Sequence, residues 1–197
     1  MYGNALWLPS HSPKFDLMKK LFALMALILS LSLANSNDAQ AQAAPKPRKS
    51  PLAVTQLKSG KTYIRIIYSQ PFKNDRQIFG GLVPYDKIWR LGANEATEIT
   101  TTHKIKIGGK TLPAGTYTMF AIPQANKWTI ILNKEVGLWG EYDYKQKQDQ
   151  LRFEVPVKMQ DQSWEAFTIK FDKTGKISTL TLVWDKTAVE IPVEVLK

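Results

Sequence analysis

The 197-residue sequence contains no cysteine, so a disulfide framework is excluded, as is a lipid-modified N-terminal cysteine. It has only two histidines, His11 and His103, which leaves no zinc or copper ligand set. A calcium site built from Glu141 and Asp143 is the remaining metal alternative, but the spacing of these residues matches no known calcium loop. We therefore expect no metal and no cofactor.

Catalytic and phosphate-binding motifs are also lacking. The sequence has no G-x-S-x-G nucleophile motif and no G-x-x-x-x-G-K-[ST] phosphate loop. Gly80-Gly81 is not followed by Lys-Thr, and Gly108-Gly109, which precedes Lys110-Thr111, has Lys104 where the first glycine of the loop would stand. The formal net charge is +10, but no nucleic-acid-binding motif accompanies it, and we expect no nucleic-acid partner. The scattered lysines are typical of a solvated face, with weak attraction to acidic partners as the alternative reading.

Residues 1–43 predict a leader that is removed after export. Met18–Lys20 begins a basic segment, Leu21–Leu33 is an apolar run broken only by serines, and Ala39–Ala43 contains small-x-small cleavage sites. The apolar run is shorter than the roughly 20 residues that span a bilayer, so a signal peptide is favoured over a membrane anchor. We expect Met18 to be the true start. We also expect an exported protein, in the periplasm or at the surface of a Gram-negative bacterium.

The rest of the chain predicts a linker and one all-β domain. Residues 44–51 contain three prolines, which is typical of an extended linker. Within residues 52–197, apolar and polar side chains alternate along 151–158, 167–171 and 189–195, as in half-buried antiparallel strands. Turn residues separate about nine such segments, a number usual for folds of this kind. This spacing predicts an antiparallel β-sandwich, with a jelly roll as one form of it.

The connection between Ser69 and Thr97 is the first candidate for a site, because long ordered loops are often functional. Within it, Arg90 could clamp a carboxylate or phosphate, Asn94 could donate to an oxygen, and Glu95 could act as a base or ligand. The structural alternative is that Arg90 pairs with Glu95 or Glu98 while Asn94 only shapes the turn. Arg76, earlier in the connection, is a further ligand-binding candidate.

Three more candidates lie outside that connection. His103 could act as a general base, but an ordinary strand residue is the simpler interpretation. Trp139 and Tyr142 belong to an aromatic cluster that could stack on sugar rings or dock a peptide. The structural alternative for these two aromatic residues is that they cover the end of the domain.

A series of ordered motifs resembles a known family. They include Y-S-Q-P at Tyr68–Pro71, W-R-L-G-A-N-E-A-T at Trp89–Thr97, L-P-A-G-T-Y at Leu112–Tyr117 and W-T-I-I-L-N at Trp128–Asn133. The chain is similar over nearly all of 52–197 to the secreted bacterial proteins of domain of unknown function 2911, seen chiefly in Bacteroidota. The resemblance implies an exported all-β domain, and it implies no activity and no catalytic residues.

The missing catalytic motifs favour a non-catalytic binding module of the periplasm or cell surface, with a glycan, peptide or small anion as ligand. A structural domain that binds an envelope protein is the first alternative, and an exposed apolar patch would favour it. The second alternative is a hydrolase-type enzyme that uses Glu95 with Arg90 or His103, which requires these side chains to converge in a pocket.

Overall fold

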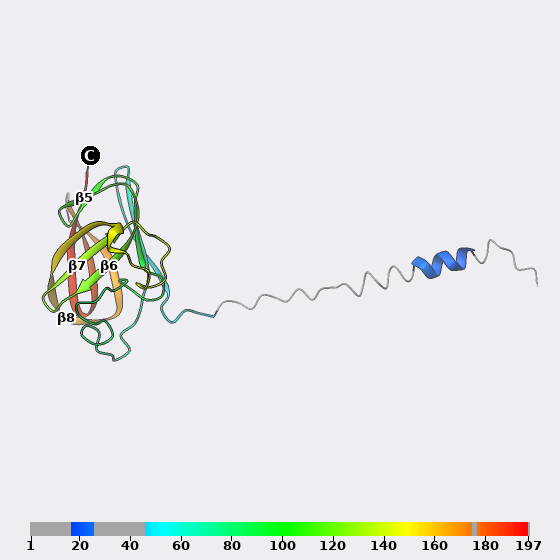
Figure 1. Cartoon of the computed structure of the whole chain (residues 1–197), viewed down its shortest axis with the longest axis horizontal. Helices are drawn as coiled ribbons and strands as arrows, with labels where there is room; N and C mark the ends of the chain where they lie inside the picture. The colour runs from blue at the N-terminus through cyan, green and yellow to red at the C-terminus, as the bar shows by residue number, and fades with distance from the viewer. Residues whose placement is uncertain (1–16, 26–45, 175–176, 197) are drawn as a thin grey trace, which may run out of the picture. The chain divides into compact units, whose positions relative to one another are not determined.

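The structure is a computed structural model that describes residues 17–25, 46–174 and 177–196 (Figure 1). The chain divides into two compact units, Met1–Lys46 and Pro47–Lys197. In the first unit, residues 17–25 form a helix. None of the helices in the described residues is both long and apolar enough to cross a membrane. The predicted cleavage region, 39–43, lies outside the described residues.

The second unit is mostly β-structure. Its strands are β1 (Leu52–Ser59), β2 (Thr62–Ser69), β3 (Thr97–Thr101), β4 (Ile105–Ile107), β5 (Lys110–Leu112), β6 (Gly115–Pro123), β7 (Lys127–Asn133), β8 (Asp149–Thr174) and β9 (Ile177–Val195). A short 3₁₀ helix, Gln146–Gln148, precedes β8. The unit begins at Pro47, so the end of the predicted linker belongs to the same compact body as the strands.

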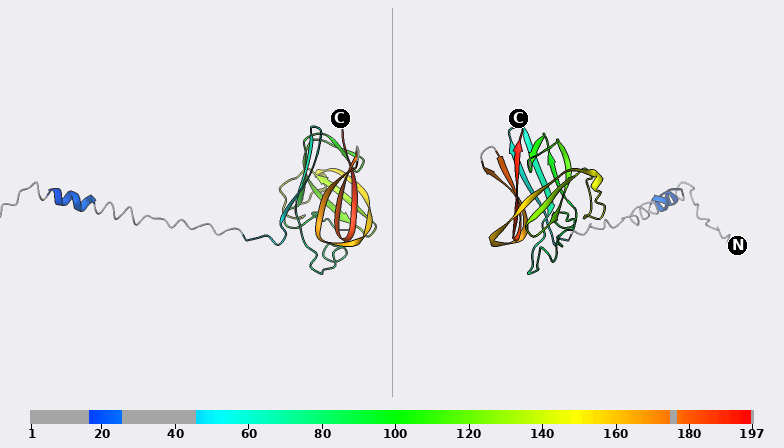
Figure 2. Two further views of the ribbon diagram at one scale, coloured as in Figure 1. Left: turned by 180° about the vertical axis from the view of Figure 1, so that it is seen from behind. Right: turned by 60° about the vertical axis from the view of Figure 1, so that its left-hand side comes forward.

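The nine strands form one open antiparallel sheet in the order β1-β2-β3-β6-β7-β8-β9-β4-β5. The predominance of antiparallel β-structure predicted from the alternating pattern is therefore confirmed. The long strand β8 joins the two halves of the sheet, because residues 149–156 pair with β7 and residues 157–174 pair with β9. The register of the β8–β9 pairing shifts between Met159 and Trp164, and Figure 2 shows the strands of this unit curving around a common interior.

That interior holds one main hydrophobic core with contributions from every strand of the sheet. Its largest side chains include Trp128 of β7 and Phe167 of β8, both fully buried. Trp89, from the connection between β2 and β3, stacks on Trp184 of β9 with ring centroids 6.1 Å apart. Aromatic rings of this size bury large apolar areas, so this contact fixes the connection against the core and positions the loops described next.

Candidate functional site

The connection between β2 and β3 is an ordered loop held by backbone pairing. It forms isolated bridges at four points, where Phe72 pairs with Ala166, Phe79 with Val83, Trp89 with Ala121 and Glu95 with Trp139. The indole Nε1 of Trp89 also donates a hydrogen bond of 3.2 Å to the carbonyl oxygen of Gly92. Regular bonding of this kind makes the loop a rigid support for the side chains it carries.

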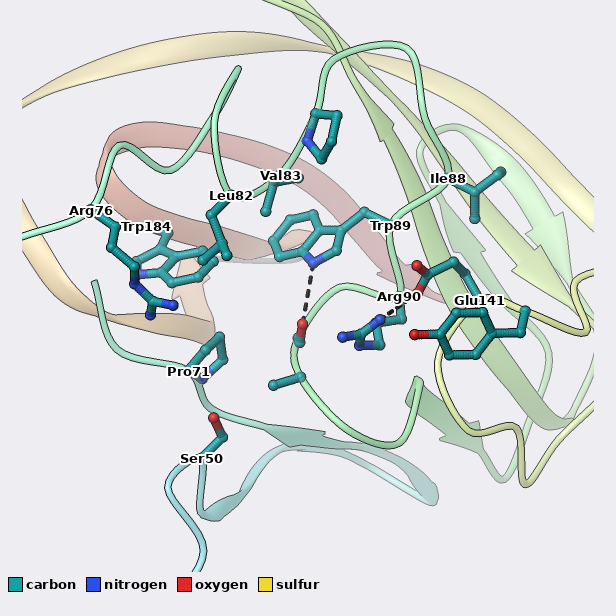
Figure 3. A pocket seen from close by; sticks show the side chains of 14 residues that line it. Ser50, Pro71, Arg76, Leu82, Val83, Ile88, Trp89, Arg90, Glu141 and Trp184 are labelled. Atoms are coloured by element: carbon teal, nitrogen blue, oxygen red, sulfur yellow. Dashed lines mark hydrogen bonds and ion pairs between the residues drawn. The ribbon is translucent and has the colours of Figure 1, made fainter. Parts of the chain in front are cut away.

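A pocket of about 380 Å³ lies between this connection and the loop that follows β7. Such a volume is within the usual range for small-ligand sites. In Figure 3, Arg76 and Arg90 lie on opposite sides of the pocket, with Trp89 between them. The lining residues are Ser50, Pro71, Arg76, Leu82, Val83, Pro84, Ile88, Trp89, Arg90, Gly92, Ala93, Glu141, Tyr142 and Trp184. We refer to it as the main pocket.

Arg90 forms an ion pair in the main pocket with Glu141, where Nη1 lies 2.5 Å from Oε2. Its partner is thus neither Glu95 nor Glu98, the two carboxylates that the sequence offered. The side chains of Arg90 and Glu141 are 25% and 30% exposed, so the pair remains accessible from the pocket. Arg90 Nε is buried and has no hydrogen-bond partner among the described residues.

Glu95 is held by the segment that precedes the first strand. Both terminal nitrogens of Arg48 donate to its carboxylate, at 2.8 and 2.5 Å, and Ser69 Oγ donates at 3.0 Å. The hydrogen bonds from the Arg48 guanidinium are the main reason that the pKa of Glu95 falls to about 2. Glu95 is therefore ionised near neutral pH, and it attaches the N-terminal segment to the connection.

A second pocket, of about 320 Å³, adjoins this ion pair and is lined by Arg48, Lys49, Ser50, Asn94 and Trp139. We refer to it as the side pocket. Asn94 has a φ of 56°, a backbone conformation that asparagine tolerates better than most residues. Its carbonyl oxygen accepts a 3.0 Å hydrogen bond from the backbone nitrogen of Gly140. Asn94 thus shapes its turn, as the structural alternative proposed, and also lines a pocket. Ser50 lines both pockets, so the two are adjacent.

Each pocket carries one exposed aromatic residue. Trp139, in the side pocket, is 59% exposed, and Tyr142, in the main pocket, is 77% exposed. These values argue against the interpretation that the two rings cover the end of the domain. Gly140 adopts a φ of 72°, and a Cβ there would lie 2.8 Å from the Tyr142 ring. Glycine at this position therefore lets the exposed ring lie against the backbone.

Arg76 is fixed by backbone carbonyls rather than by an acid. Its Nε donates to the carbonyl oxygen of Lys73 at 2.9 Å, and its Nη2 donates to that of Phe72. Within the part of the chain that the structure describes, no carboxylate pairs with Arg76. Its positive charge at the main pocket is therefore not compensated by a local ion pair.

His103 lies away from both pockets. It follows the end of β3, whereas Glu95 precedes the beginning of that strand, and a strand rises about 3.3 Å per residue. The side chain is exposed, and its Nδ1 lies 3.0 Å from Thr102 Oγ1. The structure therefore brings together six of the seven candidates, all except His103. Those six are Arg76, Arg90, Asn94, Glu95, Trp139 and Tyr142.

Sequence reasoning missed the contribution of the N-terminal segment, Arg48 to Ser50. A proline-rich composition gave no sign that these residues pack on the domain, and only the structure reveals the partner of Arg48. Chemically, the two pockets offer aromatic faces, cations and one ion-paired carboxylate, that of Glu141, which are suited to a polar ligand with apolar faces. Across the described residues, no group of three or more His, Cys, Asp or Glu side chains is arranged to hold a metal ion.

Comparison with known proteins gives one match. A family model described as a protein of unknown function (DUF2911) matches residues 50–193. No curated protein and no solved structure matches the chain.

Proposed function

We propose that this chain, which belongs to the DUF2911 family of proteins of unknown function, is a non-catalytic binding module that takes a carbohydrate in its main pocket. The observation that carries the proposal is the exposure of the Tyr142 ring, 77%, at a pocket that also contains the Arg90–Glu141 ion pair. A sugar presents an apolar C–H face and a rim of hydroxyl groups. An aromatic ring packs against the first, and charged hydrogen-bonding groups bind the second.

The side chains of the main pocket are partly fixed before a ligand binds, which favours a binding site over an ordinary polar surface. The ion pair with Glu141 holds the Arg90 side chain, so this residue loses little rotamer freedom when a ligand binds. A peptide or a small anion, the other two ligand classes considered from the sequence, would use the same groups. The carbohydrate is favoured because the aromatic residue and the hydroxyl-binding ion pair line one pocket.

The enzyme alternative has less support. Glycoside hydrolysis requires a carboxylic acid that gives up a proton near neutral pH, and such an acid has a raised pKa. The pKa of Glu95 is instead lowered to about 2, and its carboxylate is occupied by Arg48 and Ser69. A hydrolase of this type would need Glu95 to lie beside Arg90 or His103. Neither residue contacts Glu95 in the described residues, so the observed arrangement does not support that role.

A structural envelope domain is the second candidate function, favoured by an apolar surface. Leu52 and Val54 of β1 are 56% and 59% exposed. Leu52 also lines a shallow groove of about 290 Å³ together with Ile67 and Leu138. Exposed apolar surface of this kind is often covered by a partner protein. Retained binding to an envelope protein after loss of all sugar binding would favour this function.

The location and fold class are part of the same proposal. We propose export through the predicted leader, to the periplasm or cell surface, where a sugar-binding module would meet polysaccharides. We also propose that the curved sheet is a β-sandwich of jelly-roll type. Support comes from β8, which pairs with different strands along its two halves, and from Tyr68 of β2, which bonds to Ile169 of β8.

A glycan array followed by calorimetric titration tests the proposal. The purified protein should bind at least one glycan, and Tyr142→Ala should weaken that binding roughly tenfold or more, whereas Tyr142→Phe should retain it because the ring remains. Met159→Ala, which shortens another exposed side chain (70% exposed), is the control and should not change the affinity. Absence of binding to every glycan would overturn the proposal.

A further inference from the structure

Resting on the proposed function, we infer that the ligand is an acidic oligosaccharide that spans the main pocket and the side pocket. The inference starts from the adjacency of the two pockets. Ser50 lines both of them, and Ala93 of the main pocket is followed directly in the chain by Asn94 of the side pocket. A ligand of more than one sugar unit can therefore pass from one pocket to the other.

The two pockets repeat the same set of groups. Each has one exposed aromatic ring, Tyr142 in the main pocket and Trp139 in the side pocket. Each also has an arginine that is ion-paired to a glutamate, namely Arg90 with Glu141 and Arg48 with Glu95. A repeat of this kind suits a ligand that itself repeats, with one unit per pocket.

Each pocket also contains a cation without a carboxylate partner. In the main pocket this is Arg76, whose side chain donates hydrogen bonds to two backbone carbonyls. In the side pocket it is Lys49, which is exposed and forms no ion pair with any residue that the structure describes. The two ion pairs cancel their own charges, so Arg76 and Lys49 leave the pockets with an excess of positive charge. Carboxylate or sulfate groups on successive sugar units would neutralise it.

This arrangement favours an acidic glycan over a nucleic acid. Binding along a phosphate backbone uses a continuous series of cations, one for each contacted phosphate. Here each pocket offers only one uncompensated cation, Arg76 or Lys49, and the main pocket also contains the ion-paired carboxylate of Glu141, for which a phosphate group has no hydrogen-bond donor. Carboxylates are instead good acceptors for sugar hydroxyl groups.

The first test is the composition of the hits on an array that holds neutral glycans, acidic glycans and single-stranded oligonucleotides. Hits that carry carboxylate or sulfate groups are expected, with dimers or longer oligomers bound about tenfold more tightly than the monosaccharide. Hits among neutral glycans only would overturn the inference and leave the proposed function intact. No glycan hit at all would overturn both. Equal affinity for an oligonucleotide would overturn the glycan assignment.

The second test removes the charges one at a time. Lys49→Gln and Arg76→Gln should each weaken binding of the acidic hit by about threefold to tenfold, and should not change binding of the same glycan after its acidic groups are removed. Lys58→Gln, which makes the same charge change at an exposed position of β1, is the matched control. Because Arg76 also holds two backbone carbonyls, Arg76→Lys serves as the charge-retaining variant. Unchanged affinity in Lys49→Gln and Arg76→Gln would overturn the inference.

Discussion

At the scale of the residue, Glu95 shows how one carboxylate attaches a proline-rich segment to a folded domain. Its two oxygens accept hydrogen bonds from Arg48, which precedes β1, and from Ser69, the last residue of β2. Since the start of β1 pairs with the end of β2, both donors lie at the same end of this hairpin. Arg48 and Glu95 are 42% and 39% exposed, so solvent screens their attraction. The pair therefore positions the segment more than it stabilises the whole fold.

The pH dependence of stability should show the titration of Glu95. The pKa of this carboxyl is about 2 in the folded protein against an ordinary value of 4.5. Its ionisation therefore stabilises the fold above about pH 4.5, and that small contribution is lost as the pH falls from about 4.5 to 2. Thermal unfolding of Glu95→Gln should show a smaller drop in Tm over this range than the unsubstituted protein.

The control for that measurement is Glu154→Gln, which removes the carboxylate of another exposed ion pair, with Lys127. Its pH profile should follow that of the unsubstituted protein more closely than the Glu95→Gln profile does. Identical profiles for Glu95→Gln and the unsubstituted protein would contradict the role assigned to the Arg48–Glu95 pair.

At the scale of the element, the turn between β4 and β5 depends on two glycines with different surroundings. Gly108 and Gly109 have φ angles of 55° and 76°, as a two-residue hairpin with positive φ at both positions requires. A Cβ on Gly108 would lie 2.3 Å from the ring of Phe153, whereas a Cβ on Gly109 would meet no atom within 4 Å. The first glycine is needed for both conformation and space, and the second for conformation alone.

Alanine substitution should separate these two requirements. Gly109→Ala should cost about 1 kcal/mol of unfolding free energy, which is the cost of a positive φ in a residue with a side chain. Gly108→Ala should cost more, about 3 kcal/mol, because the ring of Phe153 must also move. Urea denaturation of both variants provides the measurement, and equal losses would show that the close approach of Phe153 has no energetic consequence.

The sequence signal for this hairpin is local. A Gly-Gly pair between alternating segments specifies the turn directly. The identity of β8 was less predictable. The alternation at 151–158 and 167–171 predicted separate strands, but both segments belong to β8, which changes its pairing partner from β7 to β9. Periodicity indicates which face of a strand is buried, and it contains no information on which strand lies beside it.

At the scale of the whole molecule, one buried hydroxyl connects distant parts of the sheet. Tyr68 of β2 accepts a 3.1 Å hydrogen bond from the backbone nitrogen of Ile169, and the ring of Tyr68 contacts Phe167 edge to face with centroids 5.7 Å apart. Burial raises the pKa of Tyr68, so the hydroxyl remains protonated over the physiological range. These contacts join β2 to the second half of β8 although the two are not neighbours in the strand order.

Removal of that hydroxyl should therefore destabilise the entire second unit. Tyr68→Phe would leave the buried N–H of Ile169 without its acceptor, at an expected cost of about 1–3 kcal/mol in chemical denaturation. The control is Tyr63→Phe, because the Tyr63 hydroxyl bonds to the exposed side chain of Gln56, and its removal should cost about 0.5 kcal/mol or less. A loss in Tyr68→Phe no larger than in the control would contradict this account.

The long-range contacts of the whole molecule determine which parts of the site were predictable. Loop composition indicated Arg90, Asn94 and Glu95, because polar residues concentrated in a long connection stand out in a sequence. Their partners did not stand out, since Arg90 bonds to Glu141 and Glu95 bonds to Arg48 across separations of 51 and 47 residues. Ion pairs of this kind depend on how the sheet curves, which no local pattern encodes.

Ser50, at the border of the two pockets, gives the molecule a convenient reporter position. Since the chain has no cysteine, a Ser50→Cys variant would contain a single thiol and could be labelled there with one environment-sensitive dye. The emission of the dye would respond to a ligand in either the main pocket or the side pocket. Any molecule that enters the site could thereby be followed in real time, before its chemical identity is known.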